Sequence, residues 1–80
     1  MRAVVTVQRG SRAADLDLPA DRPVGEIAAA IARAWQLDGS AWLSQSDRLL
    51  PPDVTLAGIG IESGASLTLI VFGSWGAPVT

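Results

Sequence analysis

The sequence predicts an α+β fold in which a mixed, four- to five-stranded sheet packs on one helix. Three observations lead to this class: an alternating apolar run interrupted by Gly10-Ser11, one apolar stripe at helical spacing, and a second alternating run at residues 66–72. Eighty residues make one small domain, and the chain has neither cysteine nor histidine. Its stability must therefore come from the apolar core, without a disulfide or the usual zinc ligands.

The N-terminal segment predicts a β-hairpin. Alternate residues are apolar from Ala3 to Val7, and alternate residues are apolar again from Ala14 to Leu18. Period-two alternation on both sides of a Gly-Ser break is typical of two antiparallel strands joined by a tight turn.

A single helix follows the hairpin. Pro23 suits its first turn, and Gly39 is expected to end it in a left-handed cap after Asp38. Trp35 lies at the end of the stripe and is expected in the core. The stripe that faces the sheet consists of Val24, Ile27, Ile31 and Trp35.

The rest of the chain predicts two short strands around Ser46-Asp47, a turn-rich segment from Pro51 to Gly64, and a last strand at residues 66–72. The order strand, strand, helix, strand, short strand, turn, strand in so short a chain suggests a β-grasp. In that arrangement the first and last strands are parallel neighbours at the centre of the sheet.

Composition excludes several classes of function. The net charge is -2, and six arginines are scattered among acids with no lysine, so no nucleic acid is expected as a partner. No apolar run approaches the roughly 20 residues of a membrane helix, so we expect no direct membrane insertion by this segment. With no signal peptide at its start, the chain is expected in the cytoplasm.

No catalytic, cofactor-binding or metal site is expected. The serines have no histidine, cysteine or lysine to activate them. Asp15, Asp17 and Asp21 are interpreted as a solvated strand face rather than a metal site, because alternate carboxylates on a strand are usually exposed.

Two segments, "LDLPADRPVGEI" and "RLLPPDVTLAGIGIESGASLTLI", carry a resemblance to ubiquitin-like proteins over essentially the whole chain. Within that superfamily the chain looks most like the YukD type and the N-terminal domain of EccD, both associated with bacterial type VII secretion. The resemblance implies a ubiquitin-like β-grasp domain at residues 1–73 and a flexible C-terminal tail at residues 74–80. It also implies a non-enzymatic protein-protein interaction module, either a small cytoplasmic accessory protein or the cytosolic domain of an inner-membrane subunit.

Conjugation is not expected. Ubiquitin-type modifiers and sulfur carriers end in adjacent glycines, whereas Gly73 and Gly76 are separated by Ser74 and Trp75. The alternative to a type VII secretion module, from another class of function, is the small ubiquitin-like accessory subunit of a multicomponent oxygenase.

Strand parity predicts the binding surface. Side chains that alternate with Leu67 and Leu69 should point away from the core. The same alternation in the third strand is expected to expose Ser44. The resemblance puts Ile70 on a surface that ubiquitin uses for its receptors, with Ser44 where ubiquitin has an isoleucine. Subunits of a secretion apparatus are the expected partners, with a homodimer as a further option. Tail cover by Trp75, or no significance at all, are the alternatives for this surface. The residues expected to bind protein are Val4, Trp42, Ile70, Phe72 and Trp75.

Overall fold

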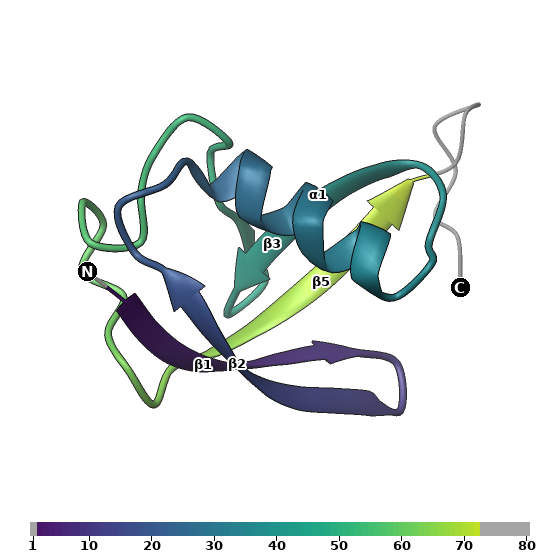
Figure 1. Cartoon of the computed structure of the whole chain (residues 1–80), viewed down its shortest axis with the longest axis horizontal. Coiled ribbons are helices and arrows are strands. Elements are labelled where there is room, and N and C mark those ends of the chain that lie inside the picture. The colour runs from purple at the N-terminus through teal and green to yellow at the C-terminus, as the bar shows by residue number, and fades with distance from the viewer. Residues whose placement is uncertain (1, 73–80) are drawn as a thin grey trace.

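The computed structural model describes residues 2–72 and consists of five strands and one helix (Figure 1). Gly73, Trp75 and the expected tail at residues 74–80 lie outside the described residues. The elements are β1 (Arg2–Arg9), β2 (Arg12–Pro19), α1 (Val24–Ala34), β3 (Ser40–Gln45), β4 (Arg48–Leu49) and β5 (Ser66–Phe72).

The five strands form one mixed sheet in the order β2-β1-β5-β3-β4. β1 and β5 are parallel, with Val7 opposite Leu67, while the other neighbours are antiparallel. Helix α1 crosses one face of this sheet (Figure 1). The expected β-grasp, with its first and last strands as parallel neighbours in the centre, is therefore confirmed.

Both hairpins close through two-residue turns whose backbone suits the twist of the strands. Gly10 has a φ of 60° at the first turn position, as a type II′ turn requires. Ser46 and Asp47 have φ values of 51° and 65°, the pattern of a type I′ turn. The second hairpin is shorter than the first because β4 contains only two residues.

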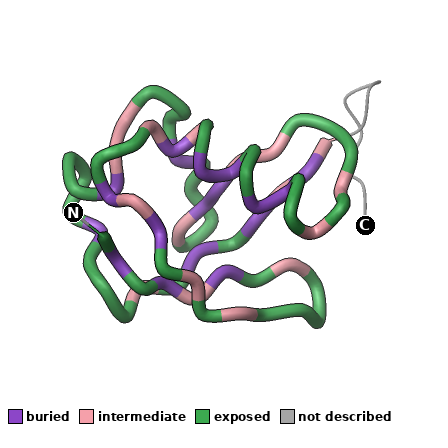
Figure 2. The backbone as a smooth tube through the Cα atoms, in the orientation of Figure 1, coloured by how far each residue is buried: buried purple, intermediate pink, exposed green. Residues whose placement is uncertain are grey.

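The core lies between α1 and the sheet. Figure 2 shows the alternation of buried and exposed positions along β1 and β5. Trp35 is only half-buried: it packs against the core from its edge, with the Arg12 guanidinium 4.2 Å from its ring centroid. Its place differs from the expectation because the helix ends at Ala34. The largest fully buried side chains are Val5, Val7, Val24, Leu43, Leu56, Leu67, Leu69 and Val71.

The N-terminus of α1 is docked on the loop that follows β4. Pro23 is the N-cap rather than part of the first turn, and no side chain caps the helix. Instead the Val24 N–H donates to the Val54 carbonyl at 2.7 Å, and the Gly25 N–H donates to the Pro52 carbonyl at 2.9 Å. These bonds satisfy two of the N–H groups that every helix start leaves unpaired, so the loop holds the helix in place.

The C-terminus of α1 ends in a Schellman motif at Gln36, not at Gly39 as expected. Gln36 has a φ of 59°; its N–H donates to the Arg33 carbonyl at 3.1 Å, and the Leu37 N–H donates to the Ala32 carbonyl at 2.8 Å. The helix stops early because Leu37 is the next residue to pack against the core.

Gly39 has a different role, which is close approach to the end of β5. Its φ is 122°, and a Cβ atom built there would lie 1.9 Å from the Phe72 carbonyl oxygen. Only a residue without a side chain lets the loop before β3 run against this strand.

We expect Gly39→Ala to lower the free energy of unfolding by about 3 kcal/mol, through backbone strain and the clash with Phe72. Gly60→Ala is the matched control, because Gly60 also has a positive φ of 79° but no atom within 4 Å of its added Cβ. That control should lose only about 1 kcal/mol. Urea denaturation measures both, and equal losses would refute the close-approach role.

We expect Gln36→Gly to raise the free energy of unfolding by about 0.5 to 1 kcal/mol, because glycine adopts the left-handed conformation without Cβ strain. Gln36→Ala keeps the strain and should leave stability nearly unchanged. Thermal unfolding of the two variants beside the parent chain checks the prediction, which fails if both behave alike.

Candidate protein-binding face

The face of the sheet opposite α1 is the candidate binding surface. Alternate residues of each strand point to this side, because successive side chains of a strand alternate between faces. Within residues 2–72, α1 is the only helix, and it packs on the other face. We call this side the outer face.

A cross-strand pair of large apolar side chains lies on the outer face. Trp42 in β3 is directly opposite Ile70 in β5, and Phe72 follows two residues later opposite Ser40. Opposite residues of an antiparallel pair have Cβ atoms about 4.5 to 5.5 Å apart, so Trp42 and Ile70 are in reach of each other. Trp42, Ile70 and Phe72 are all half-buried, so each still presents apolar surface to solvent.

Leu49 extends this cluster and was missed from the sequence. It is 51% exposed and lies opposite Ser44, which places it on the outer face diagonally beside Trp42. The two-residue turn at Ser46-Asp47 was the signal that could have revealed it, since turn length sets hairpin register. We define the outer apolar patch as Trp42, Leu49, Ile70 and Phe72.

Ser44 is buried, contrary to the expectation that it would be exposed. It points to the outer face but retains only 6% of its accessible surface. The reason is its short side chain, which has Thr68 opposite it on one side and Leu49 opposite it on the other. Larger neighbours on both sides cover a small residue even on an open face.

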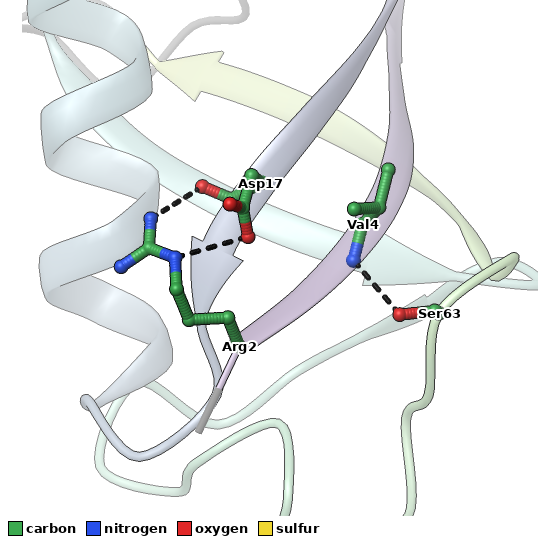
Figure 3. A network of polar contacts seen from close by, with 4 residues as sticks. All are labelled: Arg2, Val4, Asp17 and Ser63. Carbon is green, nitrogen blue, oxygen red and sulfur yellow. Dashed lines mark hydrogen bonds and ion pairs between the residues drawn. The ribbon is translucent and has the colours of Figure 1, made fainter.

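Val4 does not join the patch, which corrects the predicted grouping. Val4 is 48% exposed and lies on the outer face, but its N–H donates to Ser63 Oγ (Figure 3). The Val4 carbonyl accepts from the Gly64 N–H. Gly64 precedes Ile70 by six residues along the chain, a separation of roughly 20 Å in an extended strand. Val4 and Ile70 therefore share a face but lie at opposite ends of it.

The acidic side chains of β2 interact with β1. The Thr6 hydroxyl donates to Asp15 Oδ1 at 2.6 Å, and Arg2 Nε donates to Asp17 Oδ1 at 3.0 Å. Among residues 2–72 there is no group of three acidic, histidine or cysteine side chains arranged to hold a metal ion. The chemistry of the outer face is consequently apolar contact, flanked by these polar pairs.

The architecture and the open sheet face define the class: this is a ubiquitin-like β-grasp domain. The chain belongs to the YukD family, because the family model described as "WXG100 protein secretion system (Wss), protein YukD" matches residues 2–69. A comparison with curated proteins finds no match.

Solved structures agree on the fold. The EccD5 ubiquitin-like domain from Mycobacterium xenopi is similar with a TM-score of 0.75 at 18% identity, over 92% of this chain and 98% of that one. The ubiquitin-like domain of the Mycobacterium tuberculosis type VII secretion system protein ECCD1 has a TM-score of 0.68 at 24% identity, over 86% and 97%.

A larger assembly contains a similar domain. A chain in protomer 1 of the ESX-3 core complex has a TM-score of 0.73 at 28% identity, over 86% of this chain and 16% of that one. The chain is thus a YukD/EccD-type ubiquitin-like domain of type VII secretion systems. The oxygenase alternative finds no support in these comparisons. No helix within residues 2–72 has the length and apolar character needed to cross a membrane.

We expect a double-mutant cycle between Trp42→Ala and Ile70→Ala to give a coupling energy of about 0.5 to 1 kcal/mol, because the two side chains are directly opposite. The matched cycle of Val4→Ala with Ile70→Ala should give a coupling near zero. Chemical denaturation of the single and double variants measures both, and similar couplings would contradict the assigned register.

Proposed function

We propose that this chain is a non-catalytic docking module of a type VII secretion system and that its outer apolar patch contacts a subunit of the apparatus. The observation that carries the proposal is the cross-strand pair of Trp42 and Ile70, flanked by Leu49 and Phe72 on a sheet face that no element within residues 2–72 covers. Aromatic residues are enriched at the centres of protein interfaces, and clustered exposed apolar side chains mark such sites.

The energetics support contact rather than mere exposure. Full burial of a large apolar side chain contributes roughly 1.5 to 3 kcal/mol. Trp42, Ile70 and Phe72 are already half-buried, so burial by a partner would add only part of this free energy for each of them. Leu49 is more exposed and would contribute more. The patch therefore provides an apolar centre that needs a polar rim, which Ser40, opposite Phe72, and Thr68, two residues before Ile70, can supply on the same face.

The module acts by association, without covalent attachment. These 80 residues contain neither the adjacent glycines used in conjugation nor a lysine that could serve as an acceptor for chain building. We place the module on the cytosolic side of the apparatus, with the domain ending near residue 73 and residues 74–80 forming a tail. The similar domain within a chain of the ESX-3 core complex supports this placement.

The test uses site-specific crosslinking in the organism that encodes the chain. Because the sequence has no cysteine, Thr68→Cys places a unique thiol on the outer face beside the patch, where a photoactivatable maleimide can be attached. We expect mass spectrometry of the adduct to identify a secretion-system subunit. Adding Ile70→Arg or Trp42→Arg should reduce the adduct about tenfold, since a buried arginine without a partner costs at least as much as a lost anchor.

Val4→Arg in the same Thr68→Cys background is the matched control. It introduces the same charge on the same face, outside the patch, and should leave the adduct unchanged. An adduct between two copies of this chain would replace the proposed subunit contact by self-association. An adduct that survives both patch substitutions would refute the patch as the docking surface.

A further inference from the structure

A second surface lies on the other side of the molecule, in a groove between β2 and α1. The groove has a volume of about 410 Å³. Trp35, with the Arg12 guanidinium over its ring, lies at one end, and the Arg22–Glu26 ion pair at 4.0 Å lies at the other. Its walls are mostly apolar and are formed by Leu16, Leu18, Ile27, Ala30, Ile31 and Ala34.

β2 is an edge strand of the sheet. The hydrogen bonds made by β1 show which backbone groups of β2 point away from β1, toward the open edge. Val4 uses its N–H and carbonyl toward Ser63 and Gly64, and the Thr6 N–H donates to the Ala65 carbonyl at 2.9 Å. Asp17 is opposite Val4 and Asp15 is opposite Thr6. Because Val4 and Thr6 bond toward residues 63–65 rather than toward β2, Asp15 and Asp17 direct their backbone groups away from β1, toward the open edge.

The same alternation extends to Ala13, which is opposite Gln8. At the other end, Arg2 Nη2 donates to the Asp17 carbonyl at 2.9 Å (Figure 3), and Pro19 has no N–H to offer. Within residues 2–72, the N–H and carbonyl of Ala13 and Asp15 and the N–H of Asp17 have no backbone partner. Such a row can pair with one further strand.

We propose that β2 and the groove bind an extended segment of another protein by strand addition. A strand paired to this edge would lie about 4.8 Å from β2, above the groove. Its inward side chains would enter the space between Leu16 and Ala30. Backbone pairing supplies affinity in this mode, and pockets for alternate side chains supply specificity.

The charges indicate the chemistry of that segment. Apart from Arg12, whose guanidinium lies over Trp35, the inward positions of β2 are apolar, and Asp15 and Asp17 point to the outer face. Opposite charges on directly paired residues of neighbouring strands are stabilising. The segment should therefore alternate aliphatic residues, which fill the groove, with basic residues, which face the aspartates.

A second copy of this chain fits poorly. Pairing two β2 strands edge to edge would bring Asp15 and Asp17 of both copies onto one face, and like charges opposite one another are destabilising. The β2 edge is therefore suited to pair with a basic segment and not with the β2 edge of a second copy.

The experiment titrates the full, ¹⁵N-labelled chain with the peptide acetyl-KVRIKV-amide, followed by NMR. We expect saturable shifts at the amides of Ala13, Asp15 and Asp17 and at the groove residues, together with slower exchange of the edge amides. The acidic peptide acetyl-EVEIEV-amide, with the same aliphatic pattern, should bind at least about tenfold more weakly, given the charge reversal.

Two variants isolate the groove and the charge. Ala30→Leu fills the groove and should weaken binding about tenfold, whereas Ala29→Leu, at an exposed helix position outside the groove, should change it less than about twofold. Asp15→Lys should reverse the preference between the two peptides. Melting temperatures close to that of the parent chain confirm that each variant is folded.

Three results would overturn the proposal: no saturable binding of the basic peptide at millimolar concentration, shifts centred on Trp42 and Ile70, or equal effects of Ala29→Leu and Ala30→Leu. Because the groove and the outer apolar patch share no residue, this outcome is independent of the docking function proposed above.

Discussion

A single helix packs on a five-stranded sheet and is too narrow to bury the whole of that face. The rest of the structure depends on this constraint. α1 has 11 residues and is about 10 to 12 Å across with its side chains, whereas five strands span roughly 19 Å, as four inter-strand spacings of about 4.8 Å. Among the strands, the helix lies closest to β3. Its position depends on the two N–H bonds to the loop at Pro52 and Val54, because no side chain caps it. Among residues 2–72, one sheet face is therefore covered only in part, and the other has no element packed on it.

Both candidate surfaces follow from that single constraint. The outer apolar patch exists because no described element covers the far side of β3 and β5, and the groove exists because a helix placed toward β3 leaves a hollow beside β2. Strand order and the choice of face keep the two apart, since β1 lies between β2 and the patch strands, and the groove is on the helix side of the sheet. Under the two proposals above, one partner would lie against a sheet face and another along a sheet edge.

Much of the fold could be predicted from local sequence, and the errors have one physical origin. Parity alone assigned Leu67, Leu69 and Val71 to the core, and all three are buried. The position of Val4 could not be predicted, because it depends on the pairing of Val7 with Leu67, which lie far apart in sequence. Gly39 was assigned to the helix cap because glycine favours left-handed backbone, but its approach to Phe72 is a tertiary contact that no local pattern encodes. The groove likewise requires knowing that Ala30 faces β2.

Ser44 distinguishes the outer face of this chain from the ubiquitin surface that it resembles. It is a small buried residue in β3, and Thr68 and Leu49 lie opposite it on either side. A partner that inserts its contact at this point would meet a small polar position rather than an apolar side chain. The apolar surface has instead moved along the strands, to the pair of Trp42 and Ile70 and on to Phe72. Since affinity at an interface comes mainly from a few well-packed anchors, the proposed docking surface would select its partner through these anchors while the backbone stays that of a ubiquitin-like domain.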